Sequence, residues 1–260
     1  MKEHYRRREE TKPSEETEGQ LEGRNALQEA LKSGRTIDKV FIASGETDRG
    51  LQRLAAQAKE AGAVVVPVDR RKLDAMSTTH SHQGVIALAA AHEYCTIDDI
   101  LEEAASRGQT PLIIVCDELS DPHNLGAILR SGECAGAHGV IIPKRRSVGL
   151  TATVAKASAG AVEYMKVARV TNINNAISEL KEKGVWVFGT AAEGSIPMYK
   201  ADLTGPTAIV IGSEGDGMSQ LVRKNCDVMV HIPMAGRITS LNASAAASIL
   251  LYEAVRQRLG

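Results

Sequence analysis

The stretch LIIVCDELSDPHNLGAILR, residues 112–130, decides the fold class of this chain. Its first five residues are apolar without alternation, which is typical of a strand buried on both faces of a sheet. A helical pattern follows from Leu125. This order recurs downstream, with apolar runs at 139–142, 185–189, 207–211 and 228–232 and helical patterns at 125–137, 173–183 and 219–225. The alternation predicts an α/β domain with a helix-covered parallel sheet, in which ligands bind beyond the carboxyl ends of the strands.

A smaller α/β unit precedes this sheet. Its pattern predicts strands at 39–43, 63–68 and 84–91, and helices at 25–33, 48–61 and 69–76. The first eighteen residues are rich in Glu, carry the basic triplet Arg6 to Arg8 and are almost free of apolar side chains, which predicts a disordered arm. We therefore expect an arm at 1–18, a first domain at 19–91, a linker with an acidic helix at 92–110 and a second domain at 111–260.

Composition narrows the classes of partner. The chain of 260 residues holds 31 Lys and Arg against 32 Asp and Glu, so the net charge of −1 argues against a polybasic surface over the whole molecule. Aromatic residues make up 3% of the chain, which argues against a platform on which single-stranded bases stack. The charged first residues predict no secretory signal, and no apolar stretch approaches the ~20 residues that span a bilayer.

The four cysteines stand at Cys95, Cys116, Cys134 and Cys226. They form no CxxC pair and no zinc-type spacing with histidine, so we expect no metal site. Their pattern favours a protein of the reducing cytoplasm in which cysteine serves as a small buried apolar residue.

The first segment with chemical potential lies between the strand at 112–116 and its helix. Asn124 suits the N-cap of a helix that begins at Leu125, and Arg130 would point sideways along the strand ends. An interpretation in which Asn124 only caps and Arg130 only faces solvent fits equally well.

The second segment is GSEGDG, residues 212–217, directly after an apolar run. A glycine-rich turn after a strand is typical of nucleotide binding, but the order of glycines differs from the dinucleotide fingerprint and no GK[ST] follows. Glu214 would repel phosphates, so the turn suits a cationic ligand or a hydroxyl donor better.

The third segment is IPMAGRITSLN, residues 232–242. Pro233 ends the strand, and Ser240 and Asn242 are candidate caps for a terminal helix rich in small residues. Small residues permit close backbone approach, although an Ala-rich segment is also simply a stable helix.

Taken together and in this order, the three segments resemble the motifs of the SpoU (TrmH-like) branch of the SPOUT RNA methyltransferases. Two more stretches, KASAGAVE at 156–163 and RVTN at 169–172, resemble the subgroup that methylates a guanosine ribose of large-subunit ribosomal RNA. The first domain, with GRN at 23–25 and HQG at 82–84, is similar to that subgroup's ribosomal-protein-like RNA substrate-binding domain. Ala243 departs from the pattern, because a larger aliphatic residue is common there.

This resemblance implies a C-terminal parallel-sheet SPOUT domain with a trefoil knot, and a homodimer formed through that domain with the helix at 243–259. It implies S-adenosyl-L-methionine as the methyl donor and an RNA ribose 2′-hydroxyl as the acceptor. Cofactor contacts are then expected from the loops after the strands, at Thr190, Ala191, Gly212, Ile232, Met234 and Leu241.

The resemblance also implies that Arg130 is the central catalytic residue and that Asn124, Glu214, Ser240 and Asn242 orient it and the ribose. Because the pKa of arginine exceeds ~12, we expect Arg130 to work with an RNA phosphate rather than as a direct base. Local basic and polar clusters are the expected RNA contacts, at Arg24, Asn25, His82, Lys144, Arg145 and Arg146. Each of them also fits an ordinary solvated surface.

Other functions share these features. A transfer-RNA ribose methylase and an antibiotic-resistance methylase of ribosomal RNA belong to the same fold, and the second shares the two-domain plan. A non-catalytic RNA-binding or ribosome-assembly protein is the alternative from another class.

Overall fold

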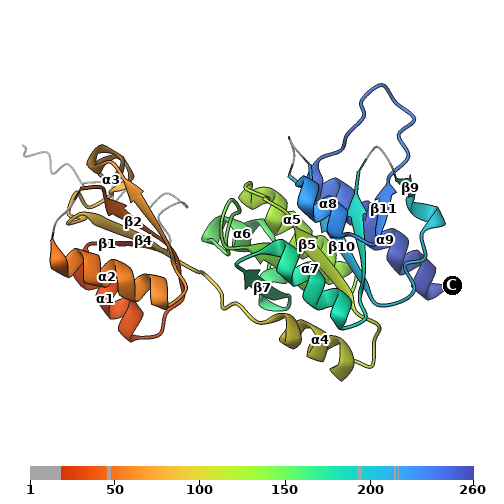
Figure 1. The fold of residues 1–260 in the computed structure, drawn as a ribbon, viewed down its shortest axis with the longest axis horizontal. Helices are drawn as coiled ribbons and strands as arrows, with labels where there is room; N and C mark the ends of the chain where they lie inside the picture. Colours follow the sequence, from red (N-terminus) through yellow and green to blue (C-terminus); the bar gives the residue numbers. More distant parts are fainter. Residues whose placement is uncertain (1–18, 46–47, 192–194, 214, 216) are drawn as a thin grey trace, which may run out of the picture.

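A computed structural model describes residues 19–45, 48–191, 195–213, 215 and 217–260. The predicted arm at 1–18 and Glu214 lie outside these residues. Figure 1 shows two domains side by side, joined by a linker that runs from β4 to α4. This arrangement confirms the fold class, a parallel-sheet domain preceded by a smaller α/β domain.

The C-terminal domain is built on a sheet whose described strands all pair in parallel, in the order β7-β6-β5-β10-β8-β11-β9. The strands are β5 (Leu112–Cys116), β6 (Gly139–Pro143), β7 (Lys166–Val170), β8 (Trp186–Thr190), β9 (Ile196–Pro197), β10 (Thr207–Ile211) and β11 (Val228–His231).

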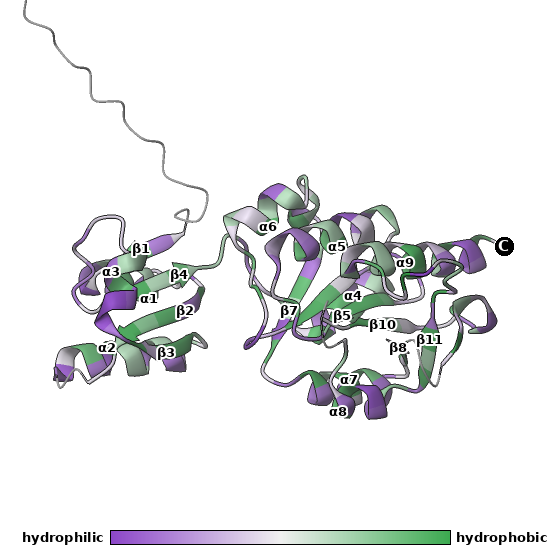
Figure 2. Cartoon of the chain, turned by 90° about the horizontal axis from the view of Figure 1, so that it is seen from above, coloured by the Kyte–Doolittle hydropathy of each residue, from purple (hydrophilic) through white to green (hydrophobic). Residues whose placement is uncertain are grey.

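Helices cover both faces of this sheet (Figure 2). One face packs against α4 (Ile97–Ser106), α7 (Ile173–Glu182) and α8 (Gln220–Asn225). The other packs against α5 (Pro122–Cys134), α6 (Ala152–Ala157) and α9 (Ala243–Leu259), with short 3-10 turns at Ala161–Glu163 and Met198–Lys200.

The central strand β5 shows why the unbroken apolar runs were informative. Ile113 and Val115 point into the core under α4 and α7, whereas Ile114 and Cys116 point into the core under α5 and α9. Successive side chains of a strand face opposite ways, so a strand between two helix layers needs an apolar residue at every position.

The N-terminal domain has a mixed sheet in the order β1-β4-β2-β3, in which β2 and β3 are parallel and the other pairings are antiparallel. α1 and α2 pack on one face, and α3 packs on the other. Its elements are β1 (Gln20–Glu22), α1 (Arg24–Lys32), β2 (Ile37–Ala43), α2 (Arg49–Glu60), β3 (Val64–Val68), α3 (Arg70–Met76) and β4 (Val85–Ala89).

One local prediction is wrong. Helix α5 begins at Pro122, three positions before the predicted start, and Asp121 is its N-cap, accepting a hydrogen bond from the His123 amide at 2.9 Å. Proline at the first helical position is pre-organised for the helix and lacks the amide that would be left unbonded. Asn124 therefore lies inside the first turn and does not cap the helix.

Two other expectations concern isolated features. Cys134 is exposed, so the prediction of buried cysteines holds for Cys116 but not for this residue. No helix of the described residues is long and apolar enough to cross a membrane, and they contain no cluster of three potential metal ligands. The trefoil knot stays a prediction.

Candidate functional site

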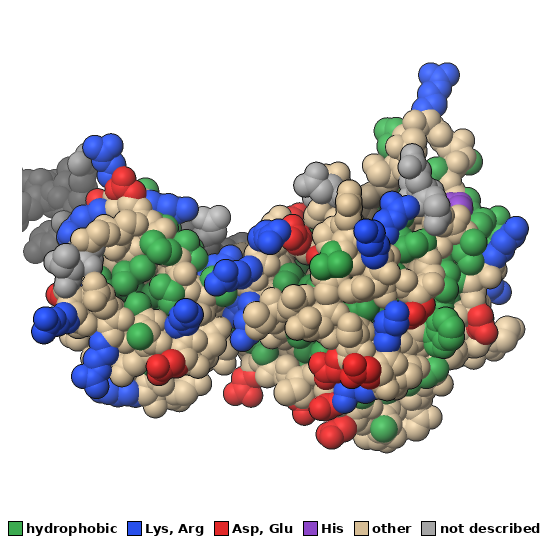
Figure 3. Space-filling view, in the orientation of Figure 1, with side chains coloured by type: hydrophobic (Ala, Val, Ile, Leu, Met, Phe, Trp, Pro, Cys, Tyr) green, Lys and Arg blue, Asp and Glu red, His purple; other side chains and the backbone are tan. Residues whose placement is uncertain are grey.

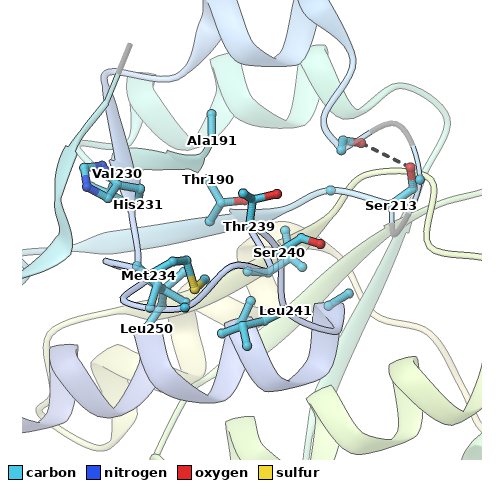
Figure 4. Close-up of a pocket in the computed structure, with 18 residues that line it drawn as sticks. Thr190, Ala191, Ser213, Val230, His231, Met234, Thr239, Ser240, Leu241 and Leu250 are labelled. Atoms are coloured by element: carbon cyan, nitrogen blue, oxygen red, sulfur yellow. Dashed lines mark hydrogen bonds between the residues drawn. The ribbon is translucent and has the colours of Figure 1, made fainter. Parts of the chain in front are cut away.

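A pocket of about 490 Å³ opens beyond the carboxyl ends of the neighbouring strands β10, β8 and β11 (Figure 4). This is the edge of a parallel sheet at which ligands bind, and the volume lies in the usual range for small-molecule sites. All six predicted cofactor residues line it, together with Ser240: Thr190, Ala191, Gly212, Ile232, Met234 and Leu241.

The end of β8 supplies a rigid wall. The Thr190 hydroxyl donates to the Val210 carbonyl at 3.0 Å, and the Ala191 amide donates to the Val230 carbonyl at 3.0 Å. These bonds tie the loop after β8 to the strands on either side. A ligand would therefore meet a wall whose shape exists before binding.

The first residue of the glycine turn after β10, Gly212, must be glycine because a side chain has no space there. A Cβ on Gly212 would overlap the backbone of Gly217 and Met218. The turn is closed by two backbone hydrogen bonds between Ser213 and Gly217, at 3.0 and 3.1 Å. Gly217 has φ of +67°, a conformation that glycine adopts without strain. The sequence order G-x-x-G-x-G thus builds a compact rim for the pocket.

The segment after β11 closes the pocket from the other side and is largely exposed. Met234 and Leu241 are each 40% exposed although both line the pocket, and Ile238 in the same segment is 77% exposed. Uncovered apolar side chains beside a pocket are typical of a ligand-binding surface.

Several pocket residues were not predicted from the sequence. His231 at the end of β11 forms a hydrogen bond with the Ser195 hydroxyl at 2.9 Å through Nδ1. Ser213, Val230, Thr239 and Leu250 also line the pocket. Ser213 follows a predicted strand and Val230 and His231 lie in another, which is a signal that could have found them. Thr239 lies in the loop after β11, and Leu250 reaches the pocket from within α9.

Two of the predicted catalytic residues, Asn124 and Asn242, are joined by a hydrogen bond. The Asn242 side chain caps α9, and its Nδ2 donates to the side-chain Oδ1 of Asn124 at 2.9 Å; Nδ2 of Asn124 in turn donates to the Asp121 carboxylate at 3.0 Å. This chain of hydrogen bonds joins the first turns of α5 and α9. Glu214 lies outside the described residues.

Arg130 lies further along α5 and is exposed. It does not line the pocket, and among the described residues its side chain has no hydrogen-bond or ion-pair partner. An exposed guanidinium keeps its five donors for a ligand that carries phosphate or carboxylate groups.

The predicted RNA contacts of the first domain are mostly bonded to their neighbours. Arg24 pairs with Asp48 at 2.6 Å and also bonds to the Gln83 backbone at 3.2 Å. His82 is buried, with Nε2 2.9 Å from Asp74 and Nδ1 accepting from the Gly84 amide at 3.1 Å. This geometry argues against a direct RNA contact by His82 and gives it a structural role. Asn25 is exposed.

The basic cluster after β6 is more accessible. Arg145 and Arg146 are exposed, and Arg146 pairs with Glu118 at 2.7 Å. Lys144 is half-buried and turns toward the first domain, where its Nζ lies 3.5 Å from the Cβ position of Gly62. Figure 3 shows Lys and Arg side chains where the two domains meet.

Comparison with known proteins identifies the fold and its class of reaction. Residues 111–252 match the SpoU rRNA Methylase family, and residues 20–95 match a domain described as RNA 2'-O ribose methyltransferase substrate binding. The Bacillus subtilis protein YacO, named for the TrmH family of tRNA/rRNA methyltransferases, is 48% identical over 91% of this chain and 94% of its own length.

This chain belongs to the SpoU rRNA methylase family. Solved structures agree with this assignment. The SpoU methyltransferase AviRb of Streptomyces viridochromogenes, in complex with the cofactor AdoMet, is 25% identical, with a TM-score of 0.59 over 92% of this chain and 90% of that one. An AdoMet-bound rRNA methyltransferase of Sinorhizobium meliloti is 26% identical, with a TM-score of 0.59 over 93% and 88%.

The chain is therefore an RNA methyltransferase that depends on S-adenosyl-L-methionine (AdoMet). The pocket fits this SpoU-family cofactor. Apolar side chains, among them Ile232, Met234 and Leu241, can surround an adenine ring. Gly212 lets the backbone of the turn fold back closely on itself, which leaves a compact backbone rim at the pocket. When bound, the cofactor supplies an electrophilic methyl group on a sulfonium.

Proposed function

We propose that this enzyme methylates the ribose 2′-hydroxyl of a guanosine in large-subunit ribosomal RNA. The carrying observation is the juxtaposition of the AdoMet-sized pocket with the Asn124–Asn242 hydrogen bond that joins α5 and α9. The description of the domain matched at residues 20–95 supports a ribose acceptor. A protein described as an RNA 2'-O ribose methyltransferase, 28% identical with a TM-score of 0.53, supports it as well.

In this proposal Thr190, Ala191, Gly212, Ile232, Met234 and Leu241 hold the cofactor. The pocket fixes the methyl donor in one place, so the acceptor oxygen has to be brought into line with it. Such positioning alone can lower a barrier by several kcal/mol, up to ~7–11. Ser240 lines this pocket, and in the proposal it orients the ribose.

In this proposal Arg130 helps to activate the ribose hydroxyl. A ribose hydroxyl is a poor nucleophile at neutral pH. Its O–H bond must be polarised, or its proton removed, as the oxygen attacks the methyl carbon. Arginine stays protonated, since its pKa exceeds ~12, so we assign Arg130 to the phosphate next to the target ribose. The phosphate held in this way polarises the 2′-hydroxyl. Asn124 and Asn242 keep the helix that carries Arg130 in register with the pocket.

RNA recognition in this proposal uses phosphates and shape. Arg24, Asn25, Arg145 and Arg146 are the accessible candidates for contacts, with Lys144 at the edge of the same surface. Few aromatic residues are available for stacking, which agrees with recognition of folded RNA by backbone and groove contacts.

The proposal includes the homodimer and the knot. Tyr252 and Leu259 of α9 are 51% and 83% exposed and lie seven residues apart, on one face of the helix. The small residues Ala243 and Ala247 are buried inside the chain, so this outer face would form the subunit contact. Sedimentation equilibrium at micromolar concentration should give twice the chain mass, and a monomer would remove the dimer from the proposal.

The cytoplasmic location stays a prediction.

The deciding experiment is a transfer assay with tritium-labelled AdoMet. The purified chain is offered large-subunit ribosomal RNA, small-subunit ribosomal RNA and transfer RNA, each made without modifications. Methyl on a ribose 2′-oxygen makes the adjoining linkage resistant to alkali, so hydrolysis and mapping identify the nucleotide. We expect one labelled guanosine in the large-subunit RNA. Label in transfer RNA would support the transfer-RNA alternative, and no label in any RNA would support a binding protein.

A further inference from the structure

Arg169 begins the RVTN stretch, and the proposed chemistry assigns it no role. It lies at the edge strand β7 of the methyltransferase domain, yet its side chain reaches into the other domain. Its Nη1 lies 2.6 Å from the Asp38 carboxylate in β2, and its Nη2 donates to the Asp38 carbonyl at 3.1 Å. The two side chains are only 6% and 7% exposed. A buried ion pair therefore crosses between the domains.

Tyr94 of the linker completes this contact. Its hydroxyl donates to the second oxygen of Asp38 at 3.0 Å and accepts from the Leu150 amide at 2.8 Å. The Arg169 guanidinium carbon lies 5.2 Å from the centre of the Tyr94 ring, close enough for a cation–π interaction. Gly149 leaves the necessary room, because a Cβ there would overlap the Asp38 carboxylate. We call Asp38, Tyr94, Gly149 and Arg169 the junction.

The shortest hydrogen bonds of the Arg169 guanidinium cross to the other domain. Both Nη atoms reach Asp38, and Nη2 also donates to the Lys144 carbonyl of its own domain at 3.4 Å, while Nε is a buried side-chain nitrogen without a hydrogen-bond partner in the described part of the chain. The linker is held as well, since the Ala91 amide bonds to the Leu150 carbonyl at 2.7 Å and the Cys95 amide to the Val167 carbonyl at 2.9 Å.

A buried ion pair of this kind contributes little net stability, because the cost of desolvating the two charges offsets their attraction. It does favour the geometry in which the two charges meet. Burial raises the pKa of Asp38 although the Arg169 charge and the Tyr94 hydroxyl act to lower it, so the pair has a high desolvation cost. A change in domain orientation that keeps the seam closed would leave a buried charge without its partner, which is strongly unfavourable. One orientation is therefore favoured over the range of orientations that linked domains usually sample.

We propose that Asp38, Tyr94 and Arg169 are positioning residues that hold the substrate-binding domain in one orientation against the methyltransferase domain. This inference rests on the proposed function, because the held orientation lets RNA bound by the first domain present its target ribose at the AdoMet pocket. The Lys144 side chain also lies close to Gly62, two residues after α2, on the same seam.

The test compares the full-length wild type with the double variant Asp38→Leu/Arg169→Met, which replaces both charges with apolar side chains. The milder Tyr94→Phe removes only the bridging hydroxyl, and covers the case in which the double variant does not fold. The matched control is Asp98→Leu/Lys183→Met, which removes an exposed ion pair of 2.6 Å that joins α4 to the residue after α7.

Small-angle X-ray scattering without RNA measures how the two domains are arranged in solution, through the radius of gyration and the distance distribution. We expect a larger radius of gyration and a broader distance distribution in the double variant, a smaller change in Tyr94→Phe and none in the control. In transfer assays, KM for RNA should rise at least about tenfold in the double variant, as expected when two linked binding sites lose their geometry. AdoMet affinity and the rate at saturating RNA should change less than about twofold.

Wild-type scattering in both junction variants would overturn the proposal, and so would an unchanged KM for RNA. If the wild type transfers methyl to no RNA, the proposed function fails, and scattering still decides whether the junction fixes the domains.

Discussion

Polar side chains of the substrate-binding domain bond to one another, whereas two candidate catalytic side chains of the methyltransferase domain, Arg130 and Ser240, face solvent. In the first domain, Arg24 bonds to Asp48 and Gln83, and His82 is buried against Asp74. In the second, Arg130 and Ser240 are exposed. The difference teaches that a polar residue in a family motif can serve the fold or the substrate, and that its partners distinguish the two roles.

Glu22 is the clearest structural case in the first domain. Its carboxylate accepts hydrogen bonds from the Ser77 hydroxyl at 2.6 Å and the Thr78 amide at 2.7 Å, with further bonds from Thr79. Burial acts to raise the pKa of Glu22, but these bonds outweigh it and hold the pKa well below its ordinary value of 4.5. They fasten the loop before β4 to the edge strand β1.

The largest effect is expected where the side chain is free. Arg130→Ala should lower methyl transfer by about 10²–10³-fold, as for the loss of one group that stabilises developing charge. The free energy of unfolding should change by no more than ~0.5 kcal/mol, since the side chain is exposed. Steady-state transfer assays and urea titration measure the two quantities. The control is Lys224→Ala, an exposed cation on α8. Near-normal turnover in Arg130→Ala would break the comparison.

Glu22→Gln should have the opposite profile. We expect the first domain to lose about 1–2 kcal/mol, because several charge-assisted hydrogen bonds weaken, while AdoMet binding stays unchanged. The folded-state pKa is below the unfolded value, so this stabilisation is present above pH 4.5 and is lost as the pH falls below it. Hydrogen exchange in β1 and β4 between pH 3 and 7 measures it, on the scale of ~1 kcal/mol. Glu29→Gln, on an exposed ion pair with Lys32, is the control. Equal loss in both variants would contradict the assignment.

Asn242→Ala tests the residue that joins both roles. It should cost about 1 kcal/mol, the usual value of an N-cap, and should also lower transfer, because α5 and α9 lose their link through Asn124. Asn172→Ala removes the equivalent cap of α7, which lies on the other face of the sheet. We expect the same loss of stability there with transfer unchanged. Chemical denaturation and the transfer assay, run on both variants, separate a cap from a site residue.

Arg24→Ala should change the free energy of unfolding only slightly, by less than about 1 kcal/mol, because the ion pair with Asp48 is partly exposed. If Arg24 also contacts phosphate, RNA affinity should fall and the salt dependence of binding should decrease by about one ion. Asp48→Asn keeps the cap of α2 but removes the competing charge, so RNA affinity should stay the same or rise. Equal RNA affinity in wild type and Arg24→Ala would leave Arg24 with a structural role only.

The sequence allowed the parallel sheet to be predicted because its strands are apolar at nearly every position, as in β5 and β10. It did not reveal β7, whose Lys166 and Arg169 break the apolar run at an edge strand. The predicted start of α5 at Leu125 is wrong because Asp121, and not Asn124, is the N-cap, and Pro122 occupies the first helical position.

The site shows the same limit. The six cofactor positions came from motif order, and the structure gathers them at one pocket. Asp38 and Arg169 are 131 residues apart, and no local pattern pairs a charge in one domain with a charge in another. Long-range contacts of this kind depend on the packing of whole domains and therefore appear only in three dimensions.

The pairing of β5 with β10 also has a consequence for how the chain folds. Leu112 lies opposite Thr207, so the middle of the large sheet forms only after most of that domain has been brought together. In the small sheet, β2 pairs with β3 and β4, which follow closely in the chain. Contacts between distant residues slow folding, since a long loop must close before they gain free energy. We therefore expect the substrate-binding domain to fold first and the methyl-transfer pocket to be among the last parts to form.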